Sequence, residues 1–403
     1  MHSVSKRIAW LLLLVVGAPV GLILGACSDD AHVEPSAQLD GGLDGTTTSE
    51  ASNARAAVID ELLSPLRASS GVPGLAAVVL RGGAVVAEGS SGARRLGDAT
   101  PIATLDTWFL GESAQPLTAT LAALVVEQGK LSWTSTLGAV LPDLPIHALY
   151  KDVTLEALLG HRGGAPAKLP DAVDQAMRVP GDAQARRTEA VRALLAAAPE
   201  LSPGSEVRRS GAGYLMAAAM LERATGAPWE QLVRERLFVP LAMTACTFDG
   251  RGASAGVVEP WGHVTTGGAL VAVAPGDAPE PPAAFGPAGR VRCPLRDWAK
   301  LSALHLAGAR GEPTPLLGAA SFTKLHSPVA VTQALGWNAV SRTWAGEELA
   351  LVAETEGELF VAVTWLAPAK NVALLVVANE SDSIARAAVD KVVGKLIEDY
   401  VPR

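Results

Sequence analysis

Residues 107–130 carry the clearest helical pattern of the chain and read Thr-Trp-Phe-Leu-Gly-Glu-Ser-Ala-Gln-Pro-Leu-Thr-Ala-Thr-Leu-Ala-Ala-Leu-Val-Val-Glu-Gln-Gly-Lys. Its apolar residues recur at helical spacing: Leu117, Leu121, Leu124 and Val125. Gly111 and Pro116 bracket the expected helix start, where backbone N–H groups have no partner within the helix. Gly129 followed by Lys130 is typical of a helix end. The sequence therefore predicts a helix that begins near Pro116 and ends before Gly129.

The composition is that of a globular protein with a large core. The chain has 403 residues, of which 49% are hydrophobic, so one two-lobed unit or two to three average domains would both fit its length. Its 41 acidic residues outnumber 33 basic ones, giving a net charge of −8. An acidic surface repels nucleic acid, so we expect no nucleic-acid partner.

The first 26 residues resemble a secretory signal. Lys6 and Arg7 precede an apolar run, and Leu24-Gly25-Ala26-Cys27 resembles a bacterial lipobox. This pattern predicts cleavage of residues 1–26, lipidation of Cys27, and attachment to membrane lipid outside the cytoplasm. An uncleaved membrane anchor is the alternative, because the apolar run is nearly long enough to span a bilayer. Residues 27–54 are rich in Asp, Gly, Ser and Thr, which predicts a flexible tether.

Residues 55–403 form the expected folded body. Residues 58–66 carry apolar side chains at helical spacing, and Gly82-Gly83 separates two short β-type runs, which predicts a hairpin. Cys246 and Cys293 are the cysteines left besides Cys27, and we expect both to be buried and free. The proline- and alanine-rich stretch 275–287 predicts a surface loop.

Residues 107–130 resemble the nucleophile segment of the serine β-lactamase and penicillin-binding-protein superfamily, whose pattern is Gly-Ser-x-x-Lys-Pro-x-Thr-Ala. The class C β-lactamase and D-alanyl-D-alanine carboxypeptidase branch is the most similar. Further segments are similar to landmarks of that family and follow in its order: residues 72–83, 153–164, 203–214, 237–243 and 368–379. The resemblance implies a two-lobed fold, with an antiparallel sheet flanked by helices and a helical lobe inserted at about residues 105–290.

The signature groups of that family are replaced in this chain. Glu112 stands where the family has its serine, and Gln115 stands where it has its lysine. In the segment that resembles Tyr-x-Asn, Arg209 falls on the tyrosine and Gly211 on the asparagine. The chain has neither Lys-Thr-Gly nor His-Thr-Gly, and residues 353–357, where that element is expected, read Ala-Glu-Thr-Glu-Gly. A serine nucleophile needs an adjacent base, so these replacements favour lost catalysis.

Other serines offer weaker candidates for a nucleophile. Ser321-Phe-Thr-Lys324 matches Ser-x-x-Lys but lies where the family has an ordinary helix, and Gly252-Ala-Ser-Ala-Gly256 lacks the strand and helix of a hydrolase elbow. Ser113 lies one position from Glu112, which rotates it about 100° around a helix. We interpret His161, in a family turn, as a hydrogen-bonded structural residue.

The sequence as a whole favours an envelope-anchored pseudoenzyme with a binding or scaffolding role, for which peptidoglycan or an envelope protein is the candidate partner. An active serine hydrolase with a relocated nucleophile, of β-lactamase, esterase or peptidase type, is the alternative, and a lipoprotein without a small ligand is a third. The histidines show no metal-binding spacing and no cofactor fingerprint occurs, so we expect neither metal nor cofactor. We further predict an ion pair between Glu112 and Arg209, with Gln115 donating a hydrogen bond to it.

Overall fold

The computed structural model describes residues 59–248, 259–274, 281–355, 357 and 359–403. The expected signal, Cys27, the tether and the serine of Gly252–Gly256 lie outside these residues, as does the expected start of the folded body at residue 55. Among the described residues, no helix is both long and apolar enough to cross a membrane.

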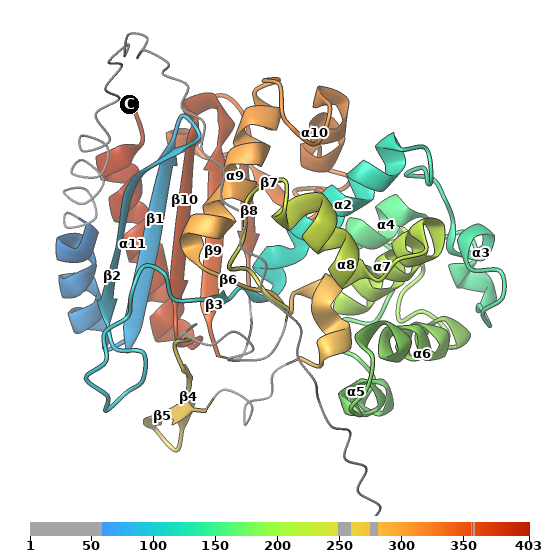
Figure 1. The fold of residues 1–403 in the computed structure, drawn as a ribbon, viewed down its shortest axis with the longest axis horizontal. Coiled ribbons are helices and arrows are strands. Elements are labelled where there is room, and N and C mark those ends of the chain that lie inside the picture. The colour runs from blue at the N-terminus through green and yellow to red at the C-terminus, as the bar shows by residue number, and fades with distance from the viewer. Residues whose placement is uncertain (1–58, 249–258, 275–280, 356, 358) are drawn as a thin grey trace, which may run out of the picture. The chain divides into compact units, whose positions relative to one another are not determined.

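The central element is a six-stranded antiparallel sheet with the strand order β2-β1-β10-β9-β8-β7 (Figure 1). Its strands are β1 (Gly74–Arg81), β2 (Ala84–Gly92), β7 (Asn338–Val340), β8 (Ala350–Glu354), β9 (Val361–Ala367) and β10 (Val372–Ala378). The predicted hairpin is confirmed as β1 and β2, which pair around the Gly82-Gly83 turn. Strand β1 also pairs with β10, with Val78 opposite Leu375. Strands from the two ends of the chain therefore lie side by side in the sheet.

Both faces of the sheet are covered by helices. Residues 59–70 are helical, and they pack with α11 (Ser383–Tyr400) on one face, where Ile59 and Val392 contact the odd-numbered side chains of β1. Helix α9 (Leu295–Ala309) packs on the other face, where the Trp298 indole donates to Thr364 Oγ1 on β9 (2.9 Å). Alternate residues of β1 thus enter two different cores, and both are apolar.

The remaining helices lie largely between β3 (Trp108–Phe109) and β6 (Arg292–Cys293), which pair with each other. They are α2 (Gln115–Glu127), α3 (Leu137–Val140), α4 (Leu155–Leu159), α5 (Asp171–Arg178), α6 (Ala183–Ala196), α7 (Gly211–Thr225) and α8 (Trp229–Val233), with α10 (Ala319–His326) following α9. The short helical turns are η1 (Gly111–Ala114), η2 (Ala148–Tyr150), η3 (Arg234–Phe238), η4 (Ala283–Ala288), η5 (Thr343–Ala345) and η6 (Pro368–Lys370). The same region also contains a hairpin of β4 (Gly262–Thr266) and β5 (Ala269–Val273).

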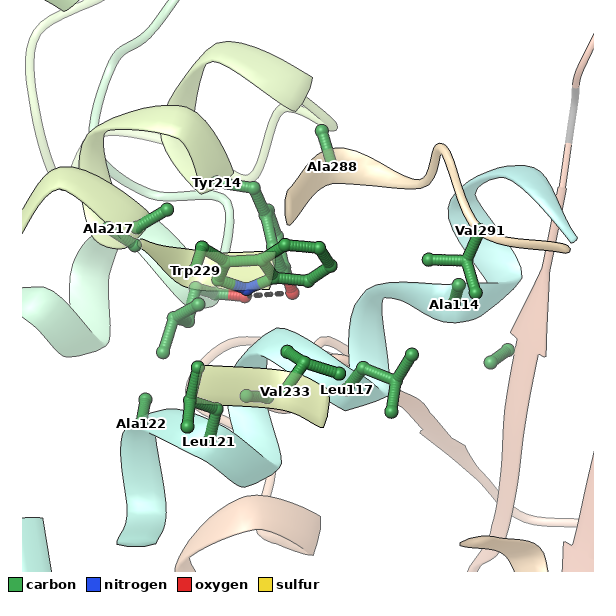
Figure 2. Close-up of a cluster of buried hydrophobic side chains, with 14 of the residues drawn as sticks. Ala114, Leu117, Leu121, Ala122, Tyr214, Ala217, Trp229, Val233, Ala288 and Val291 are labelled. Atoms are coloured by element: carbon green, nitrogen blue, oxygen red, sulfur yellow. Dashed lines mark hydrogen bonds between the residues drawn. The ribbon is translucent and has the colours of Figure 1, made fainter. Parts of the chain in front are cut away.

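Helix α2 is the predicted helix, and it is buried on every side from Gln115 to Val125 rather than along one face. The apolar cluster around it includes Trp229, whose ring lies among Tyr214, Leu117 and Val233 (Figure 2). The Trp229 indole donates to Thr118 Oγ1 (3.1 Å), and the Thr118 hydroxyl donates to a backbone carbonyl before β6 (2.7 Å). Because α2 is held on all sides, its first turn has a fixed position beside the sheet.

Two expectations about the loops are wrong. Cys246 and Cys293 form a disulfide, which ties the segment after η3 to β6. Residues 275–280 of the expected loop lie outside the described residues, but residues 283–287 belong to η4, where Ala284 is buried in the core. In both cases residues distant in sequence supply the contacts, and local composition does not reveal them.

Candidate functional site

The candidate site begins at η1, the short turn directly before α2. Gly111 has a φ of +53°, and a Cβ atom there would lie 2.1 Å from Thr355 Oγ1, so only glycine fits. Behind it, the Thr355 hydroxyl accepts hydrogen bonds from the Glu112 N–H (3.3 Å) and the Gly357 N–H (3.2 Å). Residues of the 353–357 segment therefore lie directly against the start of α2.

The predicted ion pair between Glu112 and Arg209 is confirmed. Arg209 Nη2 lies 3.0 Å from Glu112 Oε2, and the same nitrogen donates to the Glu354 carbonyl oxygen (3.0 Å). The Glu354 carboxylate lies farther away, 3.8 Å from Arg209 Nη1. The Arg209 and Glu112 side chains are 29% and 32% exposed, so the pair is partly open to solvent. It connects the start of α2, the end of β8 and the segment before α7.

Gln115 does not join this pair, which corrects the prediction. Its Oε1 accepts from His161 Nε2 (3.1 Å), and its Nε2 has no hydrogen-bond partner among the described residues. The tautomer of His161 follows from its other contact, because Nδ1 accepts from the Ser210 N–H (3.2 Å) and Nε2 must then carry the proton. Burial, with a smaller contribution from the nearby Arg209 charge, lowers the pKa of His161 to about 3. His161 is therefore a neutral structural residue, as its interpretation from sequence proposed.

Gly211 faces an aromatic ring that the sequence analysis does not predict. A Cβ atom at Gly211 would lie 2.3 Å from Phe285 Cζ, so the ring fills the space that a side chain at residue 211 would need. Phe285 comes from η4, the segment expected to be a loop. No local signal in the sequence places this ring, because its position depends on how η4 packs against α7.

The ion pair and Phe285 line a cleft of about 540 Å³. Its described lining includes five apolar side chains, two glycines and three charged residues: Phe109, Ala167, Pro281, Phe285, Ala288, Gly111, Gly289, Glu112, Arg208 and Arg209. Thr355 and Gly357 complete it. This volume falls within the range typical of small-molecule sites. The cleft therefore combines apolar and charged side chains in a volume suited to a small molecule, beside Glu112 and Arg209.

The other described serines considered as nucleophiles, and the nearby groups that would act as their bases, make hydrogen bonds or ion pairs within the fold. The Ser113 hydroxyl is buried and donates to the Leu110 carbonyl (2.6 Å). In α10, Ser321 donates to Glu127 (2.5 Å), and Lys324 pairs with Glu156 (2.6 Å) instead of with Ser321. The Tyr214 hydroxyl donates to the Leu159 carbonyl (3.0 Å), and burial raises its pKa. None of these four side chains is arranged as an activated nucleophile or as its base.

The described part of the chain contains no group of three or more histidine, cysteine, aspartate or glutamate residues that could hold a metal ion. Near the cleft, the Glu112 carboxylate has Arg209 as its partner. The Gln115 amide oxygen in turn accepts a hydrogen bond from His161 Nε2. These polar groups are therefore held in place by contacts within the protein.

Comparison with known proteins agrees with this architecture. The chain matches the Beta-lactamase family over residues 59–398 and belongs to that family. It lies within the serine β-lactamase and penicillin-binding-protein superfamily, as its motifs predicted.

The individual relatives have low sequence identity to this chain. The chain is 27% identical to penicillin-binding protein 4 of Amycolatopsis lactamdurans over 281 residues, covering 67% of this chain and 69% of that protein. Two solved structures share the fold. One is an octameric penicillin-binding protein homologue from Pyrococcus abyssi, with a TM-score of 0.68, 18% identity and coverage of 86% of this chain and 79% of that one. The other is a β-lactamase from Sulfitobacter sp. EE-36, with a TM-score of 0.67, 19% identity and coverage of 86% and 99%.

Proposed function

We propose that this protein is an envelope-anchored lipoprotein whose β-lactamase-related domain has lost its catalytic chemistry and serves in binding or scaffolding. The observation that carries the proposal is the ion pair between Glu112 and Arg209 at the cleft. By resemblance, these positions belong to the serine and the tyrosine of the family. A carboxylate and a guanidinium that bind each other supply neither a hydroxyl nucleophile nor a base for one.

The contacts of Gln115 support the same proposal. An amide cannot take a proton from a hydroxyl at neutral pH, and the Gln115 carbonyl oxygen already accepts a hydrogen bond from His161 Nε2. The Glu112 backbone N–H donates to Thr355 Oγ1. Groups that could act on an acyl substrate are thus engaged within the protein.

The test is covalent labelling of the purified full-length protein. We expect no fluorescent-penicillin or fluorophosphonate label, no mass increase of the intact protein and no turnover of a chromogenic cephalosporin. A catalytically active penicillin-binding protein treated in parallel is the positive control. A stable adduct would overturn the proposal in favour of the alternative, an active serine hydrolase, and peptide mapping would then identify its nucleophile.

Restoring the first motif should not restore activity. In the double variant Glu112→Ser and Gln115→Lys, we expect acylation by penicillin to stay below detection. Arg209 remains at the tyrosine position, and Phe285 occupies the space beside Gly211. Intact-protein mass spectrometry measures this, with thermal unfolding as the control for folding. Stoichiometric acylation of the double variant would show that the remaining cleft is still competent.

Membrane anchoring is a second part of the proposal, and it rests on the sequence around Cys27. Acyl chains contribute about 0.8 kcal/mol per buried CH₂ group, whereas a polar, acidic tether has no membrane affinity of its own. We expect Cys27→Ala to abolish palmitate labelling and partitioning into the detergent phase. Ser28→Ala is the matched control, because it changes the neighbouring residue and keeps the Cys27 thiol. Continued labelling of the Cys27 variant would contradict lipidation at this residue.

A further inference from the structure

The charged residues that line the cleft are each matched by carboxylate or guanidinium partners. Arg209 pairs with Glu112 and has the Glu354 carboxylate 3.8 Å away. Arg208 pairs with Glu200 and with Glu206, the latter at 3.1 Å. Each arginine of the cleft therefore faces two carboxylates. Among the described residues, the two arginines are thus countered by four carboxylates, of which Glu112 lines the cleft and the other three lie outside its lining. A ligand carboxylate would have to compete with these groups for the arginines.

The rest of the described lining is mostly apolar and partly aromatic. Phe109 comes from β3, Phe285 comes from η4, and Pro281, Ala167 and Ala288 add aliphatic surface. The Phe285 ring lies directly against Gly211, since a Cβ atom there would lie 2.3 Å from Phe285 Cζ. Fixed aromatic rings prefer other aromatic groups in offset or edge-to-face contact, which contributes beyond the area buried.

Resting on the proposed binding role, we propose that this cleft binds an aromatic group that carries no negative charge, such as a phenylalanine side chain within a peptide. A peptide that ends in a free carboxylate at the same residue is excluded by charge. The Glu112–Arg209 pair is the element that sets this preference, because it neutralises the arginine that would otherwise attract an anion.

Three probes of similar size test the proposal by isothermal titration calorimetry on the full-length protein. N-acetyl-phenylalanine N-methylamide is neutral, N-acetyl-phenylalanine carries one carboxylate, and N-acetyl-alanine N-methylamide lacks the ring. We expect the neutral aromatic amide to bind at least about tenfold more tightly than either of the other two. Equal or tighter binding of the carboxylate, equal binding of the alanine amide, or no binding of any probe would overturn the proposal.

A variant then tests the part played by the ion pair. In Glu112→Gln, Arg209 loses its 3.0 Å carboxylate partner, so binding of the carboxylate probe should strengthen and its disadvantage should shrink at least threefold. Glu189→Gln is the matched control, since Glu189 makes the same kind of pair with Arg186 on α6, outside the cleft lining. An unchanged ratio in the folded Glu112 variant would refute the role of the pair.

The two proposals can fail separately. A penicillin adduct would overturn the loss of catalysis without changing the order of affinities among the three non-reactive probes. The wrong order of affinities would overturn the ligand class without producing an adduct. The comparison of probes in the unmodified protein also stays decisive if a variant fails to fold.

Discussion

The coupling between Glu112 and Arg209 is measurable by a double-mutant cycle with Glu112→Gln and Arg209→Met. Glutamine keeps the shape of the glutamate without its charge, and methionine keeps part of the arginine's aliphatic length. The two side chains touch at 3.0 Å, so they are expected to couple, and each single change removes one member of the pair.

The expected coupling follows from the exposure of the pair. Two unit charges about 4 Å apart attract by about 1 kcal/mol in water and about 4 kcal/mol at an effective dielectric constant of 20. Glu112 and Arg209 are about one-third exposed, and fixing two long side chains offsets part of the attraction. We therefore expect a coupling of about 1 kcal/mol, well below the roughly 3 kcal/mol of a dry pair.

The assay is urea unfolding of the four proteins at pH 7 in low salt and in 1 M NaCl. In 1 M salt the Debye length falls to about 3 Å, so the coupling should decrease. A second cycle at Lys168 and Asp171 is the control, since these side chains are 89% and 82% exposed and should couple by less than about 0.3 kcal/mol. Coupling between Glu112 and Arg209 below that value would refute our account of the pair, and about 3 kcal/mol or more would refute its partial solvation.

Two further predictions concern the stability of the fold. Burial is the main reason that the pKa values of His161 and His326 are lowered to about 3. At mildly acidic pH these rings therefore take up protons only in the unfolded chain. Their contribution to the free energy of unfolding is fully present above pH 6.5 and is lost as the pH falls toward 3, by up to about 1.4 kcal/mol per pH unit for each ring. His161→Gln should therefore flatten the pH dependence of the free energy of urea unfolding. An unchanged slope would contradict this. Reducing the disulfide between Cys246 and Cys293, which are 47 residues apart, should lower the free energy of unfolding by about 3–4 kcal/mol. Urea unfolding with and without reductant measures this, and the double variant Cys246→Ala and Cys293→Ala is the control that should not respond to reductant. Equal stability of the unmodified protein under both conditions would contradict the prediction.

Much of the fold could be predicted because the family landmarks are local and ordered. The apolar spacing of residues 117–125 predicted α2, and the glycine turn predicted the β1–β2 hairpin. Both signals depend on the few residues around each position, which fix backbone geometry directly. The motif segments around residues 112 and 209 identified Glu112 and Arg209. Their opposite charges, at positions that adjoin each other in the family, predicted their contact.

The sequence by itself thus determined the family, the main elements and the charged partners at the cleft. Only the tertiary structure turned Gln115 toward His161, 46 residues away, placed the Phe285 ring against Gly211 and joined the two cysteines. Those contacts depend on how helices and loops distant in the chain pack together. A side chain's choice between competing hydrogen-bond partners, or the ring that fills an empty space, is decided by packing geometry, and residue type or spacing does not encode it locally.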